Sequence, residues 1–316
     1  MTDAIDVVIP TWNRRDLLER CLPTVLRQTV PVRVIVVDNG SEDDSVAVVR
    51  ERFGHAVSVI ALPENRGFGA AVNAGVRAGD GALVVLVNND VECDPGFAEA
   101  LAAPFADPRV GMAAGLLLRP GRAAIDSYGI EVDATLSGFD RFAGAPWPAT
   151  AVHARGLAGP SGGAAAYRRA ALEEAGPFDE ALFAYMEDLD LALRLRAAGW
   201  RCAGAPGATG VHLGGATFGR RSRWQVEVGG ASRAYLLRKW GVLERGPRVA
   251  AWALAMEAGV VLTETAVGRD LAALRGRRAG WRRAAGMRRR IPPAAIDPRL
   301  TFRTALRRRA ATLRPR

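Results

Sequence analysis

The sequence predicts an α/β fold in which helices flank a mostly parallel central sheet. Over residues 1–120, apolar runs of strand length alternate regularly with segments of helical period, which is the pattern of right-handed βαβ units. Runs such as Ala82–Val87 are apolar throughout, as expected for strands buried on both faces. The 316 residues, 49% hydrophobic and 24% charged, suffice for one large or two small domains.

Five of these runs are predicted to be strands, with helices between them. The strands are expected at residues 5–9, 32–37, 57–61, 82–87 and 110–118. Asn13 is expected to cap the first helix, and Ser41 with Asp44 resembles a capping box for a second helix ending at Phe53. Gly69–Ala78 is the third expected helix. Since ligands bind at the carboxyl ends of parallel strands, functional residues are expected at 10–14, 38–41, 63–69 and 88–92.

The middle of the chain has no clean period. Residues 119–158 mix Gly, Pro and isolated aromatics, which predicts hairpins and loops that could shape an acceptor site. The segment Gly159–Ala166 consists of small residues and leads to a helix expected from about Arg169. Gly162 and Gly163 would let a ligand approach the backbone closely, although tight packing explains them equally well.

A polar cluster, Asn88-Asn89-Asp90, follows the fourth predicted strand, with Glu92 just beyond it. Carboxylate and amide oxygens suit a hard cation such as Mg²⁺ or Mn²⁺, which typically holds the phosphates of a substrate. Taken alone, the motif is explained slightly better as an ordinary turn.

The other strand ends carry groups suited to a nucleotide. Asp38 can accept hydrogen bonds from a base N–H or a ribose hydroxyl, and Asn65, Arg66 and Asn73 can meet phosphate or sugar oxygens. A turn followed by a helix cap explains the segment around Asp38 at least as well.

Three acids, Glu187, Asp188 and Asp190, begin a predicted helix that Gly199 terminates. The helix dipole accounts for any one of them, but three acids exceed what capping needs, so one is a candidate general base. Further on, His212 lies in a Gly-rich loop after a short predicted strand. Sequence spacing alone cannot bring this imidazole to the aspartate of the fourth strand.

The cysteines, the start of the chain and the apolar runs indicate where in the cell the protein is expected to work. Cys21, Cys93 and Cys202 are scattered, which favours a reducing cytoplasm and argues against a zinc site. The start, MTDAIDVVIP, carries acids where an export signal carries bases, so none is expected. The apolar run Val249–Leu262 contains Glu257 and is expected to be too short to span a bilayer.

The net charge of +10 is strongly segregated along the chain. Residues 271–316 hold 15 arginines against one acid, a net +14, whereas residues 1–270 sum to −4. This tail predicts contact with a polyanion, either membrane lipid or nucleic acid. Asn65–Val72 mimics an RNA-binding strand signature, but a partner aromatic strand is missing and the following pattern is helical.

The ordered motifs resemble glycosyltransferase family 2, and most closely its bacterial rhamnosyltransferases of cell-envelope polysaccharides. The resemblance spans residues 4–240. It rests on PTWNR at 10–14, VDNGS at 37–41, NRGFG at 65–69 with Asn73, NND at 88–90, GPFDE at 176–180, EDLD at 187–190 and VH at 211–212. It implies a nucleotide-sugar fold of the GT-A type over residues 1–240, followed by a helical, arginine-rich extension at 241–316.

The resemblance also implies roles for individual residues. Asp188 would be the catalytic base, with Glu187 beside it, and Asp90 and His212 would hold Mn²⁺ or Mg²⁺. Gly162, Gly163 and Asp190 would contact the acceptor. The nucleotide sugar would be bound by Pro10, Thr11, Asn13, Arg14, Asp38, Asn39, Gly40, Asn65, Arg66, Gly67, Asn73, Asn88 and Asn89. Asn88 stands where many members carry an aspartate, which leaves Asp90 as the carboxylate of the metal motif.

The implied activity is inverting transfer of a sugar, with rhamnose from dTDP-rhamnose as first choice, to a hydroxyl of a lipid-linked or polysaccharide acceptor. The arginine-rich tail would then dock on anionic lipid at the cytoplasmic face of the inner membrane, with no nucleic acid expected. Two alternatives remain open. A sugar nucleotidyltransferase would need a Gly-rich loop after the first strand, where Pro10–Arg14 stands, and a nucleic-acid-binding protein would leave Asp90, Asp188 and His212 without a role.

Overall fold

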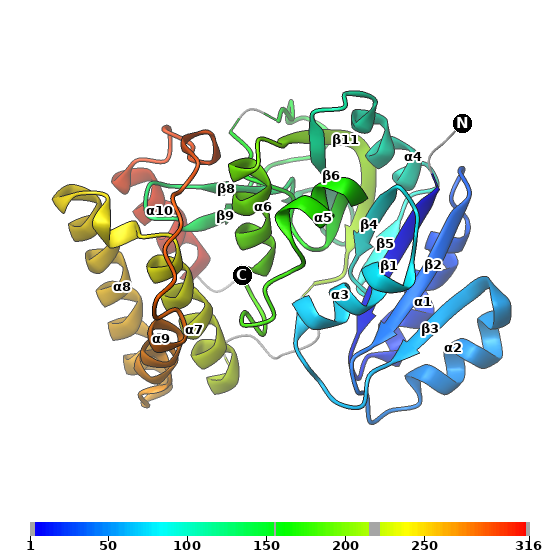
Figure 1. The fold of residues 1–316 in the computed structure, drawn as a ribbon, viewed down its shortest axis with the longest axis horizontal. Coiled ribbons are helices and arrows are strands. Elements are labelled where there is room, and N and C mark those ends of the chain that lie inside the picture. Colours follow the sequence, from blue (N-terminus) through cyan, green and yellow to red (C-terminus); the bar gives the residue numbers. More distant parts are fainter. Residues whose placement is uncertain (1–3, 155, 215–221, 314–316) are drawn as a thin grey trace.

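A mixed sheet of nine strands organises the chain (Figure 1). The computed structural model describes residues 4–154, 156–214 and 222–313. Strands of the main sheet are β1 (Ile5–Thr11), β2 (Val32–Asp38), β3 (Val57–Ala61), β4 (Leu83–Val87), β5 (Val91–Cys93), β6 (Val110–Leu118), β7 (Ile125–Ser127), β10 (Ala164–Arg168) and β11 (Arg201–His212). A separate pair consists of β8 (Ile130–Val132) and β9 (Gly138–Asp140).

The predicted parallel order is confirmed in the N-terminal half of the sheet. There β3, β2, β1 and β4 lie side by side and all pair in parallel. Strand β10 then runs antiparallel to both β4 and β6, so the sheet as a whole is mixed. The reason is the connection before β10: the predicted hairpin region at 119–158 replaces the crossover helix that a parallel neighbour would need.

Helices cover both faces of the sheet. They are α1 (Arg15–Leu26), α2 (Ser45–Phe53), α3 (Phe68–Ala78), α4 (Phe97–Ala102), α5 (Arg169–Ala175), α6 (Glu187–Ala197), α7 (Arg223–Lys239), α8 (Pro247–Gly268), α9 (Ala272–Arg283) and α10 (Phe302–Leu313). One face buries Leu18 of α1 and Phe97 of α4. The other buries Ala71 of α3, Leu172 of α5 and Leu191 of α6, so the apolar strands are covered on both sides as their composition requires.

Both predicted helix caps are wrong. Helix α1 begins at Arg15 and α2 at Ser45, and neither N-cap residue makes a side-chain cap hydrogen bond. Instead, the backbone N–H of Asn13 donates to Ser41 Oγ (2.8 Å), and that of Glu42 donates to Asn13 Oδ1 (2.7 Å). The loops after β1 and β2 lie next to each other in the parallel sheet, and this contact uses the polar atoms that the caps would need.

The C-terminal extension shares a hydrophobic core with the preceding residues. Leu189 of α6 and Trp240 at the end of α7 lie in the same buried cluster as Ala253 of α8 and Ala284 after α9. This cluster therefore crosses the predicted boundary at residue 240. The predicted helical extension is present as α8, α9 and α10, which form a layer beside α7 (Figure 1).

Helix α8 is longer than its apolar run indicated. The prediction that this run is too short to span a bilayer is wrong on length, because α8 has 22 residues from Pro247 to Gly268. Among the described helices it alone is long and apolar enough, on length and composition, to cross a membrane. Only Ala253 and Met256 of α8 are fully buried.

Candidate active site

A cleft of about 390 Å³ opens at the carboxyl ends of β1, β2 and β4. It lies where parallel strands end, as expected for a ligand site in an α/β sheet. The predicted site residues that line it are Pro10, Thr11, Asn39, Asn65, Gly67, Asn88, Asn89, Asp90, Gly162, Gly163, Glu187 and Asp188. The structure thus brings together residues from segments far apart in the sequence.

Asp38 lies beside this cleft at the end of β2 with one oxygen still available. Its Oδ2 accepts a hydrogen bond from the backbone N–H of Ser41 (3.0 Å), whereas its buried Oδ1 has no partner among the described residues. Gly40 follows with φ of +75°, and its Cα lies against the backbone of Glu64, so a side chain there would clash. The loop therefore holds Asp38 ready to accept one further donor.

Two asparagines hold the loop between β3 and α3. Asn39 donates from Nδ2 to Asn65 Oδ1 (2.9 Å), and Asn39 Oδ1 accepts the backbone N–H of Arg66 (3.0 Å). Asn65 Oδ1 also accepts the N–H of Gly67 (3.0 Å). Gly67 has φ of +88° and touches the backbone of Phe183, so only glycine fits. These polar atoms hold the wall of the cleft in place.

Five other residues predicted to bind the donor do not line the cleft: Asn13, Arg14, Gly40, Arg66 and Asn73. Asn13 and Gly40 serve the loop contacts described above. Arg14 pairs with Asp16 (2.8 Å) and Arg66 pairs with Glu180 (3.2 Å), and both arginines lie outside the lining.

Asn73 also lies outside the lining and is buried in α3. Its Oδ1 accepts the N–H of Phe178 (2.9 Å), and its Nδ2 donates to the carbonyl of the same residue (2.9 Å) and to Glu180 (3.0 Å). Both ends of the amide are thus engaged in tying α3 to the segment at 178–180.

Sheet pairing brings His212 to Asp90. His212 is the last residue of β11, a strand of 12 residues, and it pairs with Val91 of β5 directly after Asp90. Its Nε2 lies 3.2 Å from Asp90 Oδ2. The prediction of a loop position for His212 is wrong, because β11 extends further than the short strand expected from its Gly-rich sequence.

The groups around Asp90 fit a divalent cation. Asp90 Oδ1 and Asn88 Oδ1 are both buried and have no partner among the described residues. Oxygen atoms and one imidazole are ligands that Mn²⁺ and Mg²⁺ accept. The described residues contain no group of three or more His, Cys, Asp and Glu side chains that could hold a metal by themselves. Substrate phosphates would therefore have to complete the shell.

Asp126 is a functional candidate that the sequence did not single out. Its Oδ2 lies 2.7 Å from His212 Nδ1, on the side of the ring away from Asp90. Burial opposes the charged ring, but the hydrogen bonds to Asp126 and Asp90 prevail and raise the pKa of His212 to about 10. A carboxylate on the far nitrogen is the usual way to orient a metal-binding histidine. Asp126 lies in the hairpin region, which carried no motif.

Glu187 and Asp188 begin α6 at the edge of the cleft. Asp188 accepts the backbone N–H of Gly162 (3.1 Å) at Oδ2 and that of Leu189 (2.7 Å) at Oδ1. Burial raises the pKa of Asp188, and these hydrogen bonds oppose the rise. Burial and the neighbouring Asp188 raise the pKa of Glu187 to about 8, and its Oε2 has no partner among the described residues. The raised pKa of Glu187 favours its protonated form beside Asp188, which suits acid–base chemistry.

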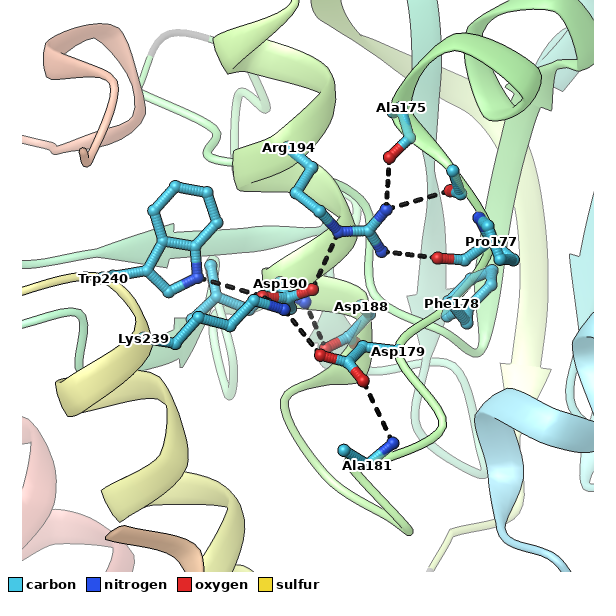
Figure 2. Close-up of polar contacts among 12 residues, drawn as sticks. Ala175, Pro177, Phe178, Asp179, Ala181, Asp188, Asp190, Arg194, Lys239 and Trp240 are labelled. Carbon is cyan, nitrogen blue, oxygen red and sulfur yellow. Dashed lines mark hydrogen bonds and ion pairs between the residues drawn. The ribbon is translucent and has the colours of Figure 1, made fainter. Parts of the chain in front are cut away.

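The prediction that Asp190 contacts an acceptor is wrong. Asp190 is completely buried, and Figure 2 shows its carboxylate among Arg194, Lys239 and Trp240. Its carboxylate accepts from Arg194 Nε (2.9 Å) and Trp240 Nε1 (3.0 Å) and pairs with Lys239 Nζ (2.8 Å). Residues two apart on a helix do not share a face, so the acidic motif divides between the cleft and the core.

Aromatic residues that the sequence left unassigned close the far side of the cleft. Phe183 and Tyr185 come from the loop before α6, and Trp224 and Gln225 come from the start of α7. The rings of Phe183 and Trp224 meet edge to face with centroids 5.8 Å apart. Tyr185 has φ of +69°, a conformation that costs a non-glycine residue ~1–3 kcal/mol and is often found at functional sites.

Comparison with known proteins agrees with this geometry. Residues 6–176 match the sequence model of Glycosyl transferase family 2. A curated relative, the N-acetylglucosaminyl-diphospho-decaprenol L-rhamnosyltransferase of Mycobacterium tuberculosis, is 32% identical over 244 residues, which cover 70% of this chain and 79% of that protein.

Solved structures share the fold at low sequence identity. The mannosyltransferase PcManGT of Pyrobaculum calidifontis, in complex with GDP-Man and Mn²⁺, superposes with a TM-score of 0.53 at 21% identity, over 99% of this chain and 81% of that one. TarS of S. aureus superposes with a TM-score of 0.52 at 18% identity, over 80% of this chain. The match spans only 42% of the TarS chain. These likenesses establish the GT-A fold alone.

Proposed function

The chain belongs to glycosyl transferase family 2, and from this premise we propose that it is a metal-dependent, inverting glycosyltransferase of cell-envelope glycan synthesis. The proposed donor is dTDP-rhamnose, and the proposed acceptor is a sugar hydroxyl on a lipid-linked or polysaccharide glycan. The observation that carries the proposal is that one cleft is lined by both Asp188, a candidate base, and Asp90, a candidate metal ligand. The name of the rhamnosyltransferase relative supports the choice of sugar and acceptor. Family membership favours this activity over nucleotidyl transfer and over non-catalytic nucleic-acid binding.

On the donor side, Asp38 would accept a hydrogen bond from the base or ribose through its unpartnered Oδ1. Asp90, Asn88 and His212 would hold Mn²⁺ or Mg²⁺. Such a cation, when bound, neutralises the charge of the departing diphosphate. The Asn39 and Asn65 amides keep the opposite wall rigid, so that the donor meets a preformed site.

On the acceptor side, Asp188 would take the proton from the attacking hydroxyl. The acceptor oxygen forms its bond to the anomeric carbon as the bond from that carbon to the diphosphate oxygen breaks, and the nucleoside diphosphate leaves. A single displacement without a protein nucleophile inverts the configuration. Gly162 and Leu189 fix the carboxylate through their N–H groups, and Glu187 keeps its own proton near neutral pH, which leaves a single negative charge on the pair.

A donor screen followed by matched variants tests the proposal. The protein with Mn²⁺ is screened by thermal shift against UDP-, dTDP- and GDP-sugars, and a donor at a hundred times its Kd should stabilise it by about 2.7 kcal/mol. Asp188→Asn should keep this donor stabilisation and lose turnover by at least ~10²-fold. Asp90→Ala should abolish metal-dependent transfer, and His212→Ala should weaken it. Full activity of Asp90→Ala in EDTA would exclude the metal site.

We also propose that the extension holds the enzyme on the cytoplasmic face of the inner membrane. Leu254, Leu262 and Val267 of α8 are 58%, 70% and 62% exposed. The two acids of this helix face the protein instead: Glu257 pairs with Arg233 (2.7 Å), and Glu264 contacts Arg277 of α9 (3.5 Å). The outer face of α8 is therefore apolar, and the arginines of the neighbouring helices would meet anionic lipid.

A further inference from the structure

A second hollow of about 230 Å³ adjoins the cleft. Phe183 and Trp224 line both spaces, so the hollow and the cleft share these two rings as a wall. The remaining wall is made by Val228, Ala231 and Ser232 of α7 and by Arg283 of α9. The hollow is thus mostly apolar and carries one cationic side chain.

Close packing of two helices positions this cation. Gly276 and Gly280 lie four residues apart on α9, and a Cβ on either would overlap the carbonyl oxygen of Glu227 or Ala231 on α7. Helix α9 therefore lies directly against α7, as Figure 1 shows, with the two backbones in contact. Arg283 follows Gly280 on the last turn of α9, so the same contact fixes it at the rim of the hollow.

The Arg283 guanidinium is exposed and lacks an acidic partner among the described residues. It donates one hydrogen bond from Nη1 to the carbonyl of Ala181 (2.6 Å), which orients it and leaves other N–H groups unused. Two other cations nearby are engaged with acids: Arg275 pairs with Glu227 (3.5 Å), and Lys239 pairs with Asp179 (2.6 Å). Arg283 is therefore an oriented cation available to an anionic ligand.

We propose that the hollow is the acceptor subsite and that Arg283 binds a phosphate of a lipid-diphosphate acceptor. This rests on the proposed function, because an acceptor bound in the hollow is useful only if Asp188 in the adjoining cleft takes a proton from it. The apolar wall suits the first part of a lipid chain or the apolar face of a sugar, and a guanidinium binds phosphate oxygens through paired N–H donors. The C-terminal extension then supplies part of the substrate site through α9, beyond any role at the membrane.

Binding of farnesyl diphosphate tests the inference without requiring turnover. Full-length protein, with its cleft occupied by dTDP and Mn²⁺, is titrated with this probe. Arg283→Gln should weaken binding at least ~10-fold, because a charge-assisted hydrogen bond to phosphate is lost. The matched control is Arg282→Gln, the exposed neighbouring arginine that does not line the hollow, and it should bind the probe as the wild type does.

Kinetics separate the acceptor from the donor. Arg283→Gln should raise the KM for a lipid-diphosphate-linked sugar at least ~10-fold and leave the KM for the nucleotide sugar unchanged. An alkyl glycoside of the same sugar, which has no diphosphate, should be used equally by both proteins. Unchanged probe binding in Arg283→Gln, or a raised donor KM, would overturn the inference while leaving the proposed function standing. Arg283-dependent probe binding without any sugar transfer would support the subsite and reject the proposed function.

Discussion

At the residue scale, buried oxygen atoms without partners mark the cleft. Asp38 Oδ1, Asn88 Oδ1, Asp90 Oδ1 and Glu187 Oε2 all lack a hydrogen-bond partner among the described residues. Each such atom costs roughly 1–3 kcal/mol of stability. Other unpartnered atoms, such as Asp133 Oδ2, lie elsewhere in the described residues, but these four acceptor oxygens lie at or beside one cleft, where a ligand could supply the missing donors or a cation.

Asp126 provides a test of the metal site that does not alter a direct ligand. Because it orients the His212 ring from the far nitrogen, Asp126→Asn should weaken apparent Mn²⁺ affinity ~10–100-fold, with most of the rate restored at high Mn²⁺. The measurement is the transfer rate as a function of Mn²⁺ concentration. Asp80→Asn, which changes an exposed carboxylate far from His212, is the control. An unchanged Mn²⁺ profile for Asp126→Asn would show that this contact has no part in metal binding.

Glu187 should make the protein less stable as the pH rises. Its pKa is raised from 4.5 to about 8 in the folded chain, so the folded state binds this proton more tightly than the unfolded state. The resulting stabilisation is complete below about pH 4.5 and is lost as the pH rises through about 8.

The test is urea unfolding of the wild type and Glu187→Gln between pH 5 and 9. Glu187→Gln should remove much of the decline in unfolding free energy, because glutamine carries no proton to lose. Glu51→Gln, at an exposed position on α2, should keep the decline of the wild type. Equal slopes in all three proteins would contradict the proton held by Glu187.

At the element scale, α6 serves two purposes on opposite faces. Asp188 points to the cleft, and Asp190 lies in a buried network whose cations are Arg194 and Lys239 (Figure 2). Arg194 also donates to the carbonyls of Ala175 (2.7 Å) and Pro177 (2.7 Å), so the network holds the segment that leads into the loop before α6. The edge of the helix that carries Asp188 is thus positioned from its buried side.

Replacing Asp190 should therefore destabilise the whole fold. Asp190→Asn leaves Lys239 and Arg194 buried with reduced countercharge, and breaking a buried pair in this way costs about 3–5 kcal/mol. Urea unfolding measures the loss, with Asp188→Asn as the matched control because that residue lies at the cleft edge, outside this network. A cost below about 1 kcal/mol would mean that the network contributes little to stability.

At the scale of the whole molecule, the extension adds further helices beside the helix-covered sheet. Its core residues join those of α6 and α7, and α9 lies against α7. The apolar outer face of α8 and the arginines of α9 and α10 belong to the same layer. A surface that combines exposed leucines with clustered arginines is suited to an anionic bilayer.

Substitution on α8 tests this surface. A double variant, Leu254→Glu with Leu262→Glu, should lose most sedimentation with vesicles containing phosphatidylglycerol, because two exposed apolar anchors become anions. Ala78→Glu, at an exposed position on α3, should sediment as the wild type does. Binding by the double variant that equals the wild type would exclude α8 as the docking face, and binding that salt does not weaken would exclude a contribution from the arginines.

Local pattern was sufficient for the elements that form the half of the molecule containing the cleft. The strands β1 to β4 and β6, the helix Phe68–Ala78 and the acids at the start of α6 were all predictable, because apolar periodicity and strand-end polarity are properties of short segments. The ordered motifs from Pro10 to His212 indicated the family for the same reason: each lies within one strand end or loop.

Tertiary structure decided which distant side chains meet. The antiparallel pairing of β11 with β5 brings His212 to Asp90, and the hairpin before β10 brings in Asp126. The packing of α6 places Asp190 in the core, and the contact of α9 with α7 places Arg283 at the hollow beside the cleft. None of these follows from local sequence, because sheet register and helix packing depend on burial and shape complementarity between segments that are far apart in the sequence.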